Sequence, residues 1–282
     1  MLPLTTDSNG VHHGDNLPHP PTLNSRDLGV SLILAERGNA VISTGGAEGF
    51  LYSIDAATGN LRWRIDLNEQ LFSPIVVDGV VYVGGRQVVD DQGGLGVGHL
   101  WAVDVETGTV RWGTWVGDTT LPLHNGVVGR AAVSNELVVA AGLHGAVVAA
   151  DRATGDIRWS RSFGEEGHSA GVAILGSVAI VANWQGMIRG LALSSGATQW
   201  EVNVGSAIIR PSTVGAGHAF LIPGIVYGYA ANGSRVYEFG GRKEALYFST
   251  PATYHNGTLY VAANNSLAGA TGGGLFALRV GH

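Results

Sequence analysis

Short apolar runs joined by two-residue turns recur along the chain from about residue 30 to its last residues. Ile75–Val77 and Val80–Val83, for example, lie on either side of Asp78-Gly79. Asn256-Gly257 lies in a similar setting. Asp-Gly and Asn-Gly favour β-hairpins, because both central residues of such a tight turn take a positive φ. Strands that are apolar without alternation indicate sheets covered on both faces.

This pattern predicts six hairpins in succession. Their turns are expected at Arg37-Gly38, Asp78-Gly79, Ser134-Asn135, Leu175-Gly176, Ala216-Gly217 and Asn256-Gly257. The second strand of each hairpin is expected at 40–44, 80–83, 137–141, 178–182, 218–222 and 258–262. Each hairpin is followed by a third strand, so the pattern extends to a larger repeated unit.

A phrase of the form Asp-x-x-Thr-Gly-x-x-x-Trp forms the third and fourth strands of these units. Intact copies are Leu51–Trp63, Leu100–Trp112 and Val147–Trp159, and degraded copies are Gly190–Trp200 and Tyr229–Tyr237. The turn glycines are 49, 47, 41 and 37 residues apart. A period of about 40–50 residues with strand, turn and strand in each unit is typical of a β-propeller.

The residues of the phrase have a structural interpretation. Asp and Thr bond backbone groups inside the turn, and Gly supplies a left-handed residue. The Trp lies on the outermost strand and is expected to pack on the neighbouring blade, where a buried indole removes roughly 150–250 Å² from water. The residues with this expected role are Asp55, Gly59, Trp63, Asp104, Gly108, Trp112, Asp151, Gly155, Trp159, Gly196, Trp200, Gly233 and Tyr237.

The fold predicted from these units is all-β, a single β-propeller of six blades with four antiparallel strands each. Residues 25–282 form the propeller, and residues 1–24, rich in proline, form an extended arm. The sixth unit has a third strand at Leu275–Val280 and no fourth strand after it. Because an open strand edge invites aggregation, the arm is expected to pair with this strand and close the ring. The candidate arm segments are Leu2–Thr6, Gly10–His13 and the stretch just after Pro21.

Composition excludes several classes of function. The net charge of −6 gives no electrostatic support for nucleic-acid binding. The chain has no cysteine, which excludes disulfides and thiolate chemistry. It has no apolar run of about 18 residues that would span a membrane. The first residues lack the basic start and apolar run of a signal peptide.

The repeated phrase resembles the repeat of the PQQ-like, or quinoprotein-type, β-propellers. This superfamily includes quinoprotein dehydrogenases, BamB-type assembly lipoproteins and sensor domains of bacterial receptor kinases. The resemblance covers residues 30–282, although the fourth unit lacks the Asp and the fifth has Tyr237 in place of Trp. The resemblance is to the BamB and sensor side of the superfamily. It implies a bacterial, extracytoplasmic protein, periplasmic or secreted.

One group of candidate binding residues stands at or just before the innermost strands. Arg130, His168 and Arg210 precede three different inner strands and are expected to converge on the central channel, with His124 nearby. Two arginines and a histidine suit an anionic ligand, because guanidinium groups pair with carboxylates in a bidentate way. A solvated channel rim is the alternative interpretation of the same residues.

A second group lies on the loops between second and third strands. Trp184, His144 and Arg86 are expected to form a docking surface for a protein partner or a sugar. Asp90 and Asp91 in the long loop 84–98 are weak candidates for Ca²⁺ ligands, against a solvated acidic loop tip.

The function predicted from these observations is a non-catalytic binding or scaffold propeller that engages a protein or small ligand through its loop face and central channel. The alternative is an enzyme, a lyase or hydrolase with His168 as base, acting on an anionic substrate in the channel. No cofactor is expected. PQQ with calcium, in a quinoprotein-type enzyme, is the other alternative. The sequence identifies neither the ligand nor the partner.

Overall fold

The structure is a computed structural model of the 282-residue chain, in which almost all regular structure is β-strand, as predicted. The residues it describes are 4–6, 12–14, 32–34, 40–44, 49–86, 98–116, 126–142, 145–164, 171–208, 212–240, 247–248, 250–264 and 273–280. Within these ranges, no helix has the length and apolar character needed to cross a membrane.

The described strands form six four-stranded antiparallel sheets and one separate hairpin. The first three sheets, in chain order, are β3 (Leu32–Leu34), β4 (Ala40–Thr44), β5 (Phe50–Asp55), β6 (Leu61–Asp66); β7 (Gln70–Val77), β8 (Val80–Arg86), β9 (His99–Asp104), β10 (Val110–Trp115); and β11 (Ala132–Val133), β12 (Leu137–Ala141), β13 (Ala146–Asp151), β14 (Ile157–Ser162).

The last three sheets are β15 (Val172–Leu175), β16 (Val178–Ala182), β17 (Met187–Ala192), β18 (Thr198–Asn203); β19 (Thr213–Gly215), β20 (His218–Leu221), β21 (Val226–Tyr229), β22 (Arg235–Phe239); and β23 (Tyr247–Phe248), β24 (Thr253–His255), β25 (Thr258–Asn264), β26 (Gly273–Arg279). The predicted second strands correspond to β4, β8, β12, β16, β20 and β25, within a few residues at their ends.

Three of the predicted tight turns have the expected backbone geometry, whereas two others are shifted by one residue, to Asn135-Glu136 and Gly176-Ser177. Asp78 and Gly79 have φ of 49° and 76°, and Asn256 and Gly257 have φ of 45° and 74°. Ala216-Gly217 adopts the same conformation, with φ of 48° and 72°. The first predicted turn, Arg37-Gly38, lies outside the described residues.

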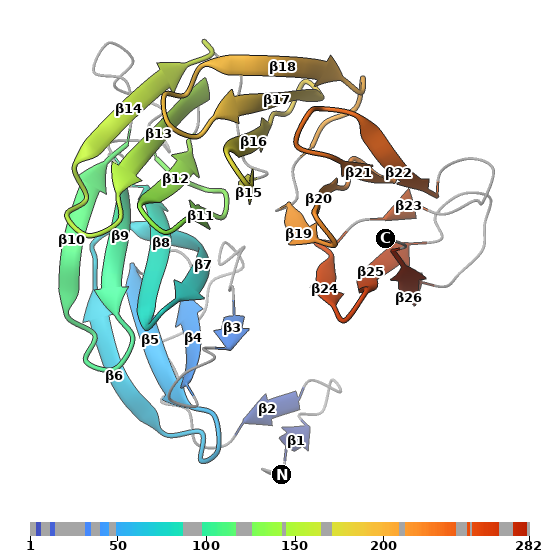
Figure 1. Ribbon diagram of the computed structural model, residues 1–282. Helices are drawn as coiled ribbons and strands as arrows, with labels where there is room; N and C mark the ends of the chain where they lie inside the picture. The colour runs from blue at the N-terminus through green and yellow to red at the C-terminus, as the bar shows by residue number, and fades with distance from the viewer. Residues whose placement is uncertain are drawn as a thin grey trace, which may run out of the picture.

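The sheets follow one another in chain order around an arc, with β7, β11, β15 and β19 on its inner side and β6, β10, β14 and β18 on its outer side (Figure 1). Buried apolar clusters lie at the junctions between successive sheets. Leu51 of the first sheet, for example, belongs to one cluster with Val81 and Val103 of the second. This is why both faces of most strands are apolar.

Tryptophans of the repeated phrase join each sheet to the next one. The indole N–H of Trp63 donates to the carbonyl of Val105 at 3.0 Å, and that of Trp112 to the carbonyl of Arg152 at 3.1 Å. Trp159 and Trp200 donate in the same way to Leu193 and Ala231, both at 2.7 Å. The acceptors Val105, Arg152 and Leu193 immediately follow the Asp position of the phrase in the next sheet, and Ala231 comes two residues after it, so an outer strand is tied to its neighbour's turn.

The sixth sheet is built differently from the others. Its innermost strand is split into β23 and β24, which both pair with β25, and Pro251 lies between them. Proline cannot donate a ladder hydrogen bond. Thr250 replaces part of the ladder, because its Oγ1 accepts from the N–H of Ala262 at 3.0 Å and donates to the carbonyl of Ala262 at 3.3 Å. The third strand, β26, lies at the edge of the described sheet.

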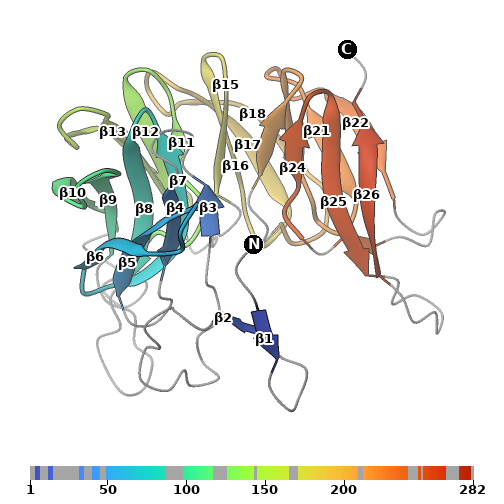
Figure 2. The same ribbon diagram turned by 90° about the horizontal axis from the view of Figure 1, so that it is seen from below.

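The described parts of the N-terminal arm do not pair with β26. β1 (Leu4–Thr6) pairs with β2 (His12–Gly14), and β26 pairs only with β25 among the described strands. Figure 2 shows this hairpin lying apart from β26. Pairing of the two arm segments closes a short loop, which loses less chain entropy than pairing across the whole chain. The stretch just after Pro21 lies outside the described residues, and a closed six-bladed ring stays a prediction.

Candidate functional site

The two ends of the strands define two faces of the arc. The turn face carries the hairpin turns, such as 78–79 and 134–136, and the Asp-x-x-Thr-Gly turns, such as 151–156. The loop face, at the opposite ends of the strands, carries the loops between second and third strands, such as 183–186, and the connections between sheets, such as 204–208. The predicted binding residues that the structure describes, Arg86, Arg130 and Trp184, lie at this end of their sheets.

Only part of the predicted site can be placed. Arg130, Arg86 and Trp184 are described. The other predicted residues lie outside the described ranges, namely His124, His144, His168, Arg210, Asp90 and Asp91. The predicted convergence of Arg130, His168 and Arg210 therefore stays a prediction.

Arg130 lies between the innermost strands of the third and fourth sheets. Its carbonyl accepts from the N–H of Val172 at 2.9 Å, and its backbone packs against Gly171, which has φ of 74°. Its Nε is shielded from solvent and has no hydrogen-bond partner among the described residues. Burial lowers the pKa of the Arg130 guanidinium. A shielded donor without a partner is able to receive an acceptor from an anionic ligand.

Arg86 is already engaged within its own sheet. Its Nε donates to Oε1 of Gln70 at 2.7 Å, and its guanidinium lies over the ring of Phe72 at 5.1 Å from the centroid. Burial lowers the pKa of Arg86. The sequence predicted that Arg86 takes part in a docking surface with Trp184 and His144. These contacts hold its side chain against β7, and the docking role stays a prediction.

Trp184 stands on a short loop that is held rigidly. Its side chain is 46% exposed, whereas the preceding residue, Asn183, is fully buried. The Oδ1 of Asn183 accepts from the N–H groups of Gln185 and Met187 at 3.1 and 2.7 Å. The carbonyl of Asn183 accepts from the N–H of Ile208 at 3.1 Å, which ties the loop to the neighbouring connection. The indole is therefore presented to solvent on a preorganised backbone.

A buried carboxylate on the same face was not recognised from the sequence. Glu69 is 6% exposed, and its Oε1 lies 2.5 Å from Nδ1 of His99. Its Oε2 accepts from the backbone N–H of His99 at 3.1 Å and from the indole N–H of Trp101 at 3.0 Å. A Cβ on Gly85 would come 2.1 Å from Oε2 of Glu69. Gly85 in β8 is the sequence signal for this site, because a larger residue there would displace the carboxylate.

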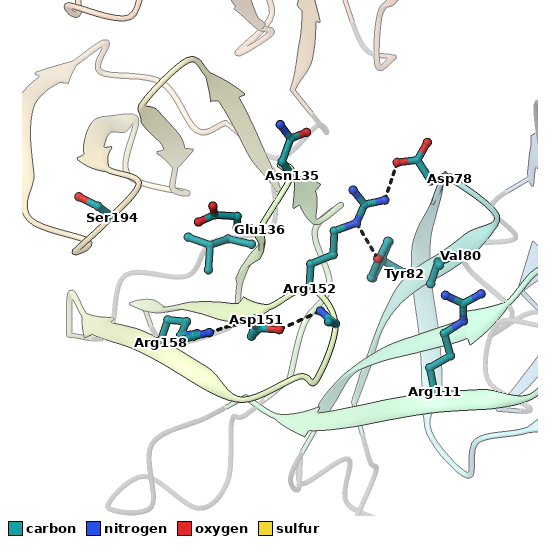
Figure 3. Close-up of a pocket in the computed structure, with 12 residues that line it drawn as sticks. Asp78, Val80, Tyr82, Arg111, Asn135, Glu136, Asp151, Arg152, Arg158 and Ser194 are labelled. Atoms are coloured by element: carbon teal, nitrogen blue, oxygen red, sulfur yellow. Dashed lines mark hydrogen bonds and ion pairs between the residues drawn. The ribbon is translucent and has the colours of Figure 1, made fainter.

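A cavity lies on the opposite, turn face. It has a volume of about 850 Å³ and is lined from the second, third and fourth sheets (Figure 3). Arg152 crosses it, donating from Nη2 to Asp78 at 2.7 Å and from Nε to the hydroxyl of Tyr82 at 3.2 Å. The hydrogen bond to Asp78 is the main cause that raises the pKa of Arg152. The guanidinium thus bridges two sheets.

One feature of the sequence points to this cavity. Arg152 directly follows the Asp of the repeated phrase, where the first two copies have Ala56 and Val105. A second hollow of about 400 Å³ adjoins it and shares Glu136 and Ser194. Asp151 in the cavity wall pairs with Arg158 at 2.6 Å, and this hydrogen bond lowers the pKa of Asp151 to about 2. Arg152 and Arg158 are thus both paired with carboxylates, and the pair of Arg152 with Asp78 joins the second and third sheets.

The described residues contain no cluster of three or more His, Asp or Glu that could hold a metal ion. The only residues proposed for Ca²⁺, Asp90 and Asp91, lie outside the described ranges. Cofactor binding stays untested.

Comparison with known families gives a match over most of the chain. A family model described as outer membrane protein assembly factor BamB matches residues 22–170, 96–235 and 143–280. These three overlapping segments run from residue 22 to residue 280. No curated protein sequence matches the chain significantly.

Solved structures show the same architecture. The computationally designed Ika8 protein is 14% identical with a TM-score of 0.62, over 83% of this chain and 68% of its own. BamB from Moraxella catarrhalis is 17% identical with a TM-score of 0.58, over 86% of this chain and 82% of its own. At these identities the likeness shows the fold alone, which is a β-propeller; the PQQ-like family is shown by the family model.

Proposed function

The chain belongs to the family of the outer membrane protein assembly factor BamB, and from this premise we propose that it is a non-catalytic scaffold that docks a protein partner through its loop face. The proposal includes an extracytoplasmic location, in keeping with the name of that family. The partner is a protein surface with an apolar pocket for an aromatic side chain.

The observation that carries this proposal is the presentation of Trp184. Tryptophan is the residue most enriched among those that dominate binding energy at protein interfaces. An exposed indole on a mobile loop would lose conformational entropy on binding. Here the hydrogen bonds of buried Asn183 fix the loop beforehand, so less of the binding energy is lost to ordering. Arg86 supports the same face by packing rather than by direct contact, and His144 is the third residue of the proposed surface.

The test is site-specific photo-crosslinking in the native compartment. A photoreactive amino acid in place of Trp184 should crosslink to one protein, and the same substitution at Val236 should not. Val236 is a suitable control because it is 49% exposed and lies on β22, away from the loop face. The crosslinked protein is then purified for binding measurements.

With the purified partner, Trp184→Ala should weaken binding by at least about tenfold, the effect expected for a dominant interface residue. Val236→Ala should leave the affinity unchanged. Equal crosslinking from both positions, or an affinity that does not respond to Trp184→Ala, would place the interface elsewhere.

A small anionic ligand is the second candidate, and the shielded Nε of Arg130 favours it. In this alternative, Arg130 and Arg210 bind the anion in the channel, with His168 as base if the protein is an enzyme. Citrate or sulfate should then raise the melting temperature, and Arg130→Ala together with Arg210→Ala should abolish that rise. A shift that persists in the double variant would show that the anion acts elsewhere.

A further inference from the structure

The turn face carries a groove that the proposed function does not use. The two hollows of about 850 and 400 Å³ adjoin, and both are lined by the turn 135–137 of the third sheet and by Ser194. The larger hollow continues to Asp78 of the second sheet, and the smaller one to Gly176 of the fourth. This turn-face groove therefore crosses the strand ends of three sheets, and its lining residues belong to the described part of the chain.

The floor of the turn-face groove is fixed by Arg152. Its Nε donates to the hydroxyl of Tyr82 at 3.2 Å, and its Nη2 donates to Asp78 at 2.7 Å. Its third nitrogen, Nη1, donates to the carbonyl of Ser134 at 3.4 Å. The backbone N–H of Arg152 donates to the carbonyl of Glu136 at 2.8 Å, which also holds the turn of the third sheet in place. A ligand therefore meets a preorganised surface, and little binding energy is lost to ordering it.

Other lining side chains have polar groups that no described residue uses. The Glu136 carboxylate and the Asn135 amide are exposed and have no hydrogen-bond partner among the described residues. Arg111 and Arg158 each donate from Nη2 to one aspartate, and the described residues accept none of their other N–H groups. The pKa of Arg158 is raised mainly by its hydrogen bond to Asp151 and to a lesser extent by the charge of Glu136. Glu136 is therefore near Arg158, so an unpaired acceptor is close to unpaired donors.

The charges of the larger hollow balance. It is lined by three arginines and three carboxylates, namely Arg111, Arg152, Arg158, Asp78, Glu136 and Asp151 (Figure 3). Balanced charges give no long-range attraction to a polyanion or a polycation. Val80 and Tyr82 in its wall are 5% and 1% exposed, so they offer no surface to an apolar ligand or side chain. The groove also crosses strand ends instead of following a strand edge, where an extended peptide would pair.

We propose that the turn-face groove binds a neutral oligosaccharide. A sugar hydroxyl both donates and accepts hydrogen bonds, which suits a surface where the acceptor Glu136 is near the donor Arg158. The larger hollow has a volume within the range of about 300–1,000 Å³ that is typical of small-ligand sites. The smaller hollow extends it for a chain of several sugars, and Asn135 and Glu136 lie where the two hollows meet. This site is independent of the Trp184 surface.

The test is an NMR titration of the full chain, labelled with ¹⁵N, with maltohexaose, xylohexaose and chitohexaose. At least one of these neutral sugars should shift the amide signals of 134–137 and 193–195. The amides of 183–187 on the loop face should not move.

The indole N–H signals provide an internal control in the same spectra. Trp112 and Trp159 donate to the carbonyls of Arg152 and Leu193, which both line the groove, so their signals should shift. The indoles of Trp63 and Trp200 donate to Val105 and Ala231, which do not line it, so their signals should stay in place.

Glu136→Ala should weaken sugar binding by at least about tenfold, as expected for loss of hydrogen bonds to a charged group. Asn135→Ala should weaken it by about threefold, as for a neutral group. Glu106→Ala is the matched control, because Glu106 is an exposed carboxylate in the phrase turn of the second sheet and does not line the groove. Trp184→Ala should also leave sugar binding unchanged, so its result separates this proposal from the docking of a protein partner.

Three outcomes would overturn the proposal. The first is the absence of shifts with all three sugars at about 10 mM, a concentration that detects a Kd of about 1 mM. The second is a set of shifts that lies on the loop face or persists unchanged in Glu136→Ala. The third is tighter binding of hexagalacturonate than of any neutral sugar, because the groove would then select a charged ligand.

Discussion

The second and sixth sheets carry the same small set of residues in the same register, and yet their exposure differs completely. Leu100 is 0% exposed in the second sheet, where the third sheet covers it, and Leu275 is 76% exposed in the sixth. The residue types alone therefore do not decide which positions form the core. The adjoining sheet decides it, and each sheet in this fold is completed by the next one.

The largest expected effect follows directly from this contrast. Leu100→Ala should lower the free energy of unfolding by about 2–5 kcal/mol, as for a fully buried leucine, and Leu275→Ala should change it by less than about 0.5 kcal/mol. Urea denaturation of both variants measures the difference. Equal losses would mean that the sixth sheet is covered in solution.

Two turn glycines test the same contrast between covered and uncovered positions, because one packs against an indole and the other faces open space. Gly196 has φ of 70°, and a Cβ there would lie 2.5 Å from the indole of Trp159 in the preceding sheet. Gly217 has φ of 72°, and a Cβ placed on it would have no atom within 4 Å. Gly217→Ala should destabilise by about 1–2 kcal/mol from the backbone alone, and Gly196→Ala by about 1–3 kcal/mol more. Thermal unfolding that shows no difference would contradict the packing of the indole on the turn.

A smaller effect is expected at the strand break of the sixth sheet. Thr250→Val keeps the shape but removes both hydrogen bonds to Ala262, so it should destabilise by about 1 kcal/mol. The amide of Ala262 should exchange faster with solvent. Thr253→Val, at an exposed position of β24, provides the control. Unchanged exchange at Ala262 in Thr250→Val would show that the hydroxyl does not replace the ladder.

The smallest effect concerns acid stability. The hydrogen bond from Arg111 is the main cause that lowers the pKa of Asp104 to about 2 from its ordinary value of 3.8. A lowered folded-state pKa gives stability that is present above the ordinary pKa and is lost as the pH falls from about 4 to 2. Asp104→Asn should flatten this part of the stability curve. Arg279→Ala, at the equivalent position of the sixth sheet, should not alter it, and an equal response would contradict the pairing.

The sequence predicted those parts of the fold that depend on neighbouring residues. Asp78-Gly79 and Asn256-Gly257 define their hairpins because both residues of each turn tolerate a positive φ. The second strands follow from these turns.

Pairings between distant segments were harder to predict. The arm was expected to pair with β26, but Leu4–Thr6 and His12–Gly14 pair locally instead. Glu69 was missed because its burial depends on Gly85 and Trp101, which are adjacent only in the folded sheet. Trp184 was expected to be exposed because it lies outside the repeated phrase. The hydrogen bond of Arg86 to Gln70 depends on the pairing of β7 with β8, and no pattern in the sequence indicates it.

The indole hydrogen bonds also have a consequence for cooperativity. Trp63, Trp112, Trp159 and Trp200 each reach only the sheet that follows. Coupling therefore extends to nearest neighbours, as in linear repeat proteins, whose stability is a sum of unit and junction contributions. Sheets coupled in this way are expected to separate first at the first and sixth sheets, while the junctions between the central sheets remain closed. Pulling on the ends of the arc would open the junctions one after another.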